Sequence, residues 1–177
     1  MDMPTDSSTS SDDDTAFLIN LCNLQVPSSI KFSPSGQQLL YSTNLIWNHY
    51  SGSTPISTLW LASTNQASSA RKLTSGSAKD YAPAWRPDGH RIAFISDRAD
   101  PGRKWAIHMM DVPLEEPTAY SSIEDDMTAV AITDETNERS IDMFKFSPDG
   151  SKIAFVSADE KTDEQKVREQ NGEDVQV

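Results

Sequence analysis

The fold is decided by the stretch PAWRPDGHRIAFIS at residues 83–96, which has two partial copies elsewhere in the chain. The copies read IKFSPSGQQLLYS at residues 30–42 and MFKFSPDGSKIAFVS at residues 143–157. Aligned on Phe32, Trp85 and Phe146, the three stretches are 53 and 61 residues apart (85 − 32 and 146 − 85). A recurrence at about 50 residues is typical of a propeller or a repeat array.

Each copy predicts a β-hairpin. An aromatic residue ends one strand, a short turn reverses the chain, and an apolar strand returns. Proline suits the first corner of a type I turn, Asp or Ser can bond to its own backbone, and glycine accepts the left-handed conformation that closes the turn. The structural turn residues are Pro34, Gly36, Pro87, Asp88, Gly89, Pro148, Asp149 and Gly150.

Two more strands follow each of the first two hairpins, at residues 57–62 and 70–74 and at residues 104–110 and 128–133. Each unit therefore has the pattern of four short antiparallel strands, which is one propeller blade. The third unit stops after its second strand, because a charged run with almost no apolar side chain follows. The sequence thus predicts an all-β partial β-propeller of about two and a half four-stranded antiparallel blades, with TolB/WD-like repeats.

The expected domain organisation follows from these repeats. We expect a disordered acidic leader at residues 1–16, the partial propeller at 17–158 and a truncated charged connector at 159–177. Blade 1 is expected at about 26–76, blade 2 at about 81–134 and the half blade at about 141–158. Because a closed propeller typically has four to eight blades, we expect the chain to be the opening part of a larger protein.

The net charge of −12 is concentrated at the two ends of the chain. Residues 1–14 hold five acids and no base, and residues 159–177 hold seven acids and three bases. Phosphate binding needs clustered Lys and Arg, so nucleic acid and anionic membranes are not expected partners. The single cysteine excludes an internal disulfide framework, and the acidic N-terminus lacks the features of a signal peptide, so a cytoplasmic setting is expected.

These repeats resemble the N-terminal propeller of the prolyl oligopeptidase family of serine peptidases, in the acylaminoacyl-peptidase and dipeptidyl-peptidase V branch. The hairpin motif is shared with TolB-type and other propellers, whereas the strand at residues 59–62 and the segment at residues 157–162 are more specific. The motifs that carry the resemblance are Val26–Ser29, Ser57–Ala62, Arg71–Gly76, Pro83–Arg98, Phe146–Gly150 and Ser157–Thr162.

The resemblance implies a propeller that restricts the entry of peptides to an α/β-hydrolase domain, which would lie C-terminal to it and carry the catalytic Ser, Asp and His. This chain has no Gly-x-Ser-x-Gly nucleophile elbow, and its only histidines are His49, His90 and His108. His90 is expected in a turn and His108 in a strand. We therefore expect no catalytic residue in this chain and no peptidase activity of its own.

For the other candidate site residues, the sequence favours structural roles over functional ones. Two acidic groups could be imagined as metal ligands, namely Asp97 with Asp100 and the run Glu124, Asp125 and Asp126. Neither group has the pattern of a calcium loop, so we expect solvated loops at both places and no metal or cofactor. Cys22 lies in an apolar run and is expected to be a small buried residue rather than a nucleophile.

The four tryptophans, Trp47, Trp60, Trp85 and Trp105, could form a binding platform. Trp60 and Trp85 recur at strand positions of the repeat, which favours packing in the core. Trp47 falls in a long loop and is the best candidate for an exposed or interdomain contact.

The sequence leaves three functions open. The first is the gating propeller of a peptidase, with a hydrolase domain and peptide substrates as partners. The second is a non-enzymatic propeller scaffold that binds a protein, and the third is a nonfunctional fragment.

Overall fold

The computed structural model describes residues 9–45, 56–112, 129–133 and 140–157, together with residues 162, 164, 167, 168 and 171. Within these ranges one helix of more than a single turn, α1 (Thr9–Cys22), precedes a series of antiparallel strands. The predicted position of Trp47, the acidic run at 124–126 and most of the connector at 159–177 lie outside the described residues.

The first sheet is formed by the first repeat. It has the order β1 (Gln25–Phe32), β2 (Gln38–Leu45), β3 (Ser57–Ser63) and β4 (Arg71–Lys72), with every neighbouring pair antiparallel. The hairpin turn lies between β1 and β2, where Phe32 pairs with Leu39. The expected strand order of one unit is therefore found.

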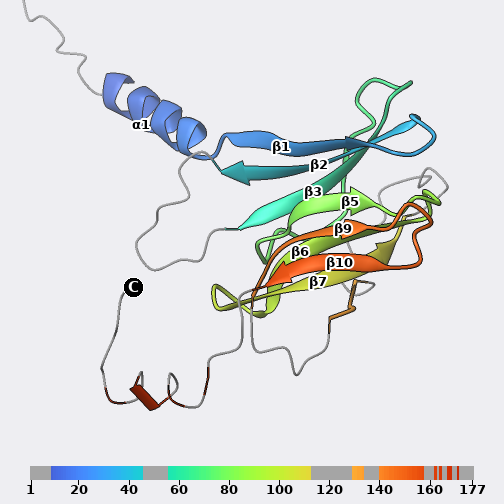
Figure 1. Cartoon of the computed structure of the whole chain (residues 1–177). Coiled ribbons are helices and arrows are strands. Elements are labelled where there is room, and N and C mark those ends of the chain that lie inside the picture. Colours follow the sequence, from blue (N-terminus) through green and yellow to red (C-terminus); the bar gives the residue numbers. More distant parts are fainter. Residues whose placement is uncertain are drawn as a thin grey trace, which may run out of the picture.

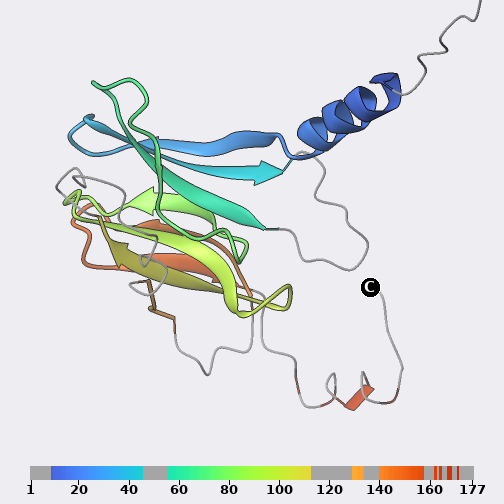
Figure 2. The same cartoon turned by 180° about the vertical axis from the view of Figure 1, so that it is seen from behind.

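The second sheet repeats this arrangement. Its order is β5 (Tyr81–Trp85), β6 (Arg91–Asp100), β7 (Lys104–Asp111) and β8 (Val130–Ala131), again antiparallel throughout. The third sheet has two strands, β9 (Ile141–Phe146) and β10 (Ile153–Ser157). The described part of the chain is thus mostly β, and its three sheets do not close on one another (Figures 1 and 2).

Two apolar layers join the sheets. The first and second sheets share a cluster made by Leu40, Leu59, Leu61 and Leu73 with Ile92, Phe94, Met110 and Val112. The second and third sheets share Ala93, Ile95, Ile107 and Ile141, against which Phe144, Phe146 and Ile153 pack. Because side chains alternate along a strand, β6 buries both of its faces, and this explains its nearly continuous apolar sequence.

Helix α1 differs from the expected disordered leader, because it covers residues 9–16 of that segment and continues through the apolar run. It projects away from the sheets in both views (Figures 1 and 2). Phe17, Leu18 and Ile19 are more than half exposed. Among the described residues, no helix has the length and apolar character needed to cross a membrane.

The expectation of a solvated loop at Asp97 is wrong. Strand β6 runs as far as Asp100, and Asp97 lies inside it with a relative exposure of 1%. The physical reason is that β6 and β7 form a longer hairpin than the apolar run alone predicts, with Asp100 paired to Lys104 beyond a register shift. Asp100 itself is exposed.

Candidate functional site

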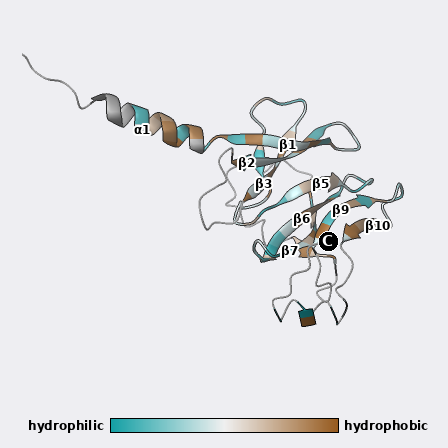
Figure 3. Ribbon diagram, turned by 60° about the vertical axis from the view of Figure 1, so that its left-hand side comes forward, coloured by the Kyte–Doolittle hydropathy of each residue, from teal (hydrophilic) through white to brown (hydrophobic). Residues whose placement is uncertain are grey.

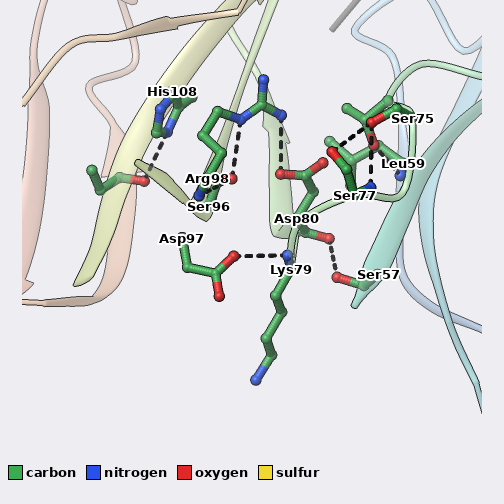
Figure 4. Close-up of polar contacts among 12 residues, drawn as sticks. Ser57, Leu59, Ser75, Ser77, Lys79, Asp80, Ser96, Asp97, Arg98 and His108 are labelled. Carbon is green, nitrogen blue, oxygen red and sulfur yellow. Dashed lines mark hydrogen bonds and ion pairs between the residues drawn. The ribbon is translucent and has the colours of Figure 1, made fainter. Parts of the chain in front are cut away.

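The most concentrated polar site joins the first and second sheets around Asp97 (Figure 4). The Asp97 carboxylate accepts a hydrogen bond from the backbone N–H of Lys79 at 2.8 Å and another from that of Gly102 at 2.7 Å. Lys79 precedes β5, and Gly102 lies in the turn between β6 and β7. One buried carboxylate therefore ties two loops to the end of β6, since its two oxygens each satisfy a backbone donor.

A second buried carboxylate completes this polar junction. Asp80, which is 1% exposed, forms an ion pair with Arg98, whose Nη2 lies 3.1 Å from Asp80 Oδ1. The backbone carbonyl of Asp80 accepts a hydrogen bond from the Ser57 hydroxyl, and its N–H donates to the Ser57 carbonyl at 3.3 Å. Ser57 begins β3, so this pair of contacts fastens the connection before β5 to the first sheet.

Arg98 is also held from two other sides. Its Nε donates to the Ser96 hydroxyl at 3.1 Å, and its guanidinium carbon lies 5.2 Å from the centre of the Phe94 ring. The Phe94 ring also stacks with the ring of His108, which is 3% exposed, with 5.9 Å between the ring centres. His108 Nδ1 lies 3.3 Å from the Ala106 carbonyl oxygen. This network positions backbone and rings, and a side chain so enclosed is suited to structure rather than to contact with a substrate.

His90 and His108 lie where the sequence predicts. His108 lies in β7, and His90 is exposed in the hairpin turn, where its backbone N–H donates to Asp88 at 3.0 Å. His49 lies outside the described residues, as does the side chain of Cys22. Among the residues whose side chains are described, no group of three or more His, Cys, Asp or Glu residues could hold a metal ion.

The hairpin turns form a second repeated feature. Gly36, Gly89 and Gly150 have φ of 72°, 75° and 69°, so the expected left-handed conformation is found. The N–H of each glycine donates to the carbonyl three residues earlier, at 2.9 Å in every case. Glycine is suited to this position because a Cβ is unfavourable at positive φ.

Successive turns also pack on one another. A Cβ placed on Gly89 would meet Pro34 Cδ at 3.6 Å, and one placed on Gly150 would meet Pro87 Cδ at 3.1 Å. The Nε of Arg86 donates to the Gly150 carbonyl at 3.2 Å. The second and third turns thus each pack on the proline of the turn before, which aligns the three sheets at this end.

The carboxylate of Asp149 is held by three hydrogen bonds in the third turn. Its carboxylate accepts hydrogen bonds from the Ser147 hydroxyl at 2.6 Å, the Ser151 hydroxyl at 2.7 Å and the Ser151 N–H at 3.1 Å. These donors stabilise the ionised form and lower the pKa of Asp149 to about 2. The side chain is exposed, so its role is to hold the turn.

The tryptophans do not form one platform. Trp85 packs on the core between the first and second sheets, as expected, and Trp105 packs on the core between the second and third. Trp60 instead lies on the face of the first sheet opposite that core, since it pairs with Tyr41 and alternates with Leu59 and Leu61. The prediction of core packing at Trp60 is therefore not met within the described residues.

Two aromatic rings, those of Tyr81 and Trp105, lie near the ammonium group of Lys79. Its ammonium lies 5.3 Å from the Tyr81 ring centre and 6.0 Å from that of Trp105. Burial raises the pKa of Tyr81, and the negative charges of Asp142 and Asp97 raise it further. The Lys79 ammonium is therefore attracted by two ring faces at the rim between the second and third sheets.

Sequence reasoning missed the polar junction because its partners are distant in the chain. Asp97 and Lys79 are 18 residues apart, and Asp80 and Ser57 are 23 apart. A usable signal was present in the pair Asp97-Arg98, because charged residues that directly extend an apolar strand must be either paired or exposed.

Comparisons with known proteins bear on the fold. No model of a protein family matches the chain, and no curated protein matches it. A solved structure from Agrobacterium tumefaciens, described as a candidate TolB, is similar with a TM-score of 0.53 and 22% sequence identity over 77% of this chain. The likeness covers 40% of that protein, so this chain spans less than half of its length. At this identity it supports a propeller-like arrangement of the sheets and nothing about activity.

Proposed function

We propose that the chain is the non-catalytic N-terminal propeller portion of a prolyl-oligopeptidase-type serine peptidase. The observation that carries the proposal is the repeated four-stranded antiparallel sheet with equivalent turns and equivalent core positions 53 residues apart. This is the pattern of propeller blades, and the motifs at residues 57–62 and 157–162 resemble those of that peptidase family. On this proposal the three sheets are two complete blades and the inner half of a third.

The proposed role is to restrict the access of substrates. A hydrolase domain in a longer form would cleave acylaminoacyl or dipeptidyl peptides, and the propeller would admit only short chains. The polar junction supports this role because Asp80, Asp97 and Arg98 hold the first two sheets in a fixed arrangement. We place the full enzyme in the cytoplasm, because the single cysteine of this chain cannot form an internal disulfide of the kind common in secreted domains.

A non-enzymatic scaffold is the second candidate function. It is favoured by the aromatic face of the first sheet, where Tyr41 and Trp60 stack with 6.3 Å between ring centres and Lys72 lies 5.6 Å from the Trp60 ring. Partly exposed aromatic residues beside a cation are common in protein interfaces.

Sequencing the transcript beyond codon 177 separates the two functions. The peptidase requires a downstream α/β-hydrolase pattern with a nucleophile elbow, and the longer product should react with a serine-directed fluorophosphonate probe. The 177-residue chain should not react. Further propeller repeats followed by a stop codon would overturn the peptidase proposal in favour of the scaffold, and labelling of the short chain would contradict the assignment of catalysis to another domain.

A further inference from the structure

In the part of the chain that the structure describes, the first and third sheets each have one face with no neighbouring sheet. On the first sheet this surface, here called the back face, is formed by Phe32, Leu39, Tyr41 and Trp60, which share one side through the pairs Phe32–Leu39 and Tyr41–Trp60. On the third sheet the corresponding surface, here called the front face, is formed by Met143, Lys145, Ala154 and Val156, paired across β9 and β10.

Both faces expose apolar area. Phe32 is 66% exposed on the back face, and Met143 and Val156 are 59% and 52% exposed on the front face. The apolar character of β10 is visible in Figure 3. Contiguous apolar surface of this kind on a soluble protein indicates an interaction site.

The internal repeat shows what each face is built to contact. In the second strand of the three repeats, Leu39, Ile92 and Ile153 are equivalent (92 − 53 and 92 + 61), and Ile92 and Ile153 both point toward the preceding sheet. The next residues, Leu40, Ala93 and Ala154, are likewise equivalent. Leu40 and Ala93 both point toward the following sheet.

The same equivalence between repeats applies to residues of the back face and the front face. Tyr41 is equivalent to Phe94, which packs on the preceding sheet, and Val156 is equivalent to Ile95, which packs on the following one. The back face is therefore a surface that receives a preceding sheet, and the front face is a surface that receives a following sheet. Two such contacts, between the first and second sheets and between the second and third, already exist inside the chain.

We propose that the front face of one copy packs on the back face of a second copy, so that this chain associates head to tail. The contact continues the stacking of the sheets by the same pairing of surfaces, with Ala154 and Val156 of one copy set against Leu39 and Tyr41 of the other. This contact requires only the kind of apolar packing that already joins the sheets at two places inside the chain. The inference does not depend on the proposed peptidase function, because it concerns the 177-residue chain alone.

Pairing of two β10 edges is the competing arrangement. Strand β10 has the apolar sequence IAFVS and carries no charge, so its free edge could align with a second β10. That contact would be isologous and would not involve the back face, whereas the head-to-tail contact is heterologous and needs both faces. Variants on the two faces therefore distinguish the two arrangements.

The test measures association of the full chain by sedimentation velocity over a range of concentrations. Val156→Lys places a charge on the front face and Leu39→Glu places one on the back face. Because burying an unpaired charge is costly, each should raise the Kd at least about tenfold. The matched control is Val130→Lys, at a residue of β8 that is 65% exposed and belongs to neither face, and it should leave the Kd unchanged.

Mixing the two variants provides the decisive measurement. A Val156→Lys copy retains its back face and a Leu39→Glu copy retains its front face, so an equimolar mixture should form a mixed pair through those two intact faces. The recovery also shows that both variants are folded. A wild-type chain that stays monomeric at every concentration would overturn the proposal. Loss of association in Val156→Lys with none in Leu39→Glu would overturn it in favour of edge pairing.

Discussion

Removing the Asp97 carboxylate tests the polar junction most directly. In Asp97→Ala the backbone N–H groups of Lys79 and Gly102 lose the carboxylate oxygens that accept their hydrogen bonds at 2.8 and 2.7 Å. Asp97 is only 1% exposed, so water cannot readily replace these acceptors. Hydrogen bonds to a charged acceptor contribute about 1.5–3 kcal/mol each, so the variant should lower the free energy of unfolding by about 3–5 kcal/mol. This is a large share of the roughly 5–15 kcal/mol that holds a typical domain together.

Urea unfolding followed by tryptophan fluorescence measures this loss. Asp100→Ala is the matched control, because Asp100 lies in the same strand but is exposed, and it should change the free energy of unfolding by less than about 0.5 kcal/mol. Hydrogen exchange adds a local measurement, since the amides of Lys79 and Gly102 should lose protection in Asp97→Ala. Wild-type stability together with unchanged protection at both amides would refute the role assigned to this carboxylate.

Three further predictions concern the turns and one strained strand position. Gly36→Ala and Gly150→Ala should each cost on the order of 1 kcal/mol from positive φ, with the larger loss at Gly150, where a Cβ would meet Pro87 at 3.1 Å. Equal losses in thermal unfolding would argue against packing of the turns. The Asp149 carboxylate should titrate by NMR with a pKa of about 2, below its ordinary 3.8, so its contribution to stability is present above pH 4 and is lost as the pH falls through 2. A midpoint near 3.8 would contradict the three hydrogen bonds. Ser29→Gly should be more stable than Ser29→Ala by about 1 kcal/mol in urea unfolding, because Ser29 has a φ of 53°. The opposite order would show that the backbone relaxes there.

Local signals account for the part of the fold that the sequence predicts. The turns at residues 34–36, 87–89 and 148–150 depend on proline and glycine conformations that act within four residues, and all three glycines have the expected positive φ. The nearly continuous apolar sequence of β6 likewise follows from the pleat, because successive side chains point to opposite faces and both faces are buried. These features need no knowledge of the rest of the chain.

Contacts between distant segments account for what the sequence does not predict. The burial of Asp97 depends on two N–H groups from other loops. The charged pair Asp97-Arg98 at the end of an apolar run indicates that partners are needed, but it does not identify them. The sequence predicts core packing for Trp60 because it recurs at a strand position of the repeat, yet the register with β2 places it on the opposite face from Leu59 and Leu61. A shift of one residue in the pairing of a strand exchanges its two faces, so the composition of the strand alone does not show which face of the sheet carries Trp60.

The backbone repeats more closely than the side chains do. Ser29 and Ala82 are 53 residues apart, both have positive φ (53° and 50°), and each lies where the first strand of its sheet shifts register against the second. Neither residue is glycine and the two side chains differ, so no local preference explains the shared conformation. A bulge increases the twist of a strand, and here it occurs in the same place in successive sheets. The stacking of one sheet on the next therefore sets this conformation, since the cost of a non-glycine residue at positive φ must be offset by packing that both sheets share.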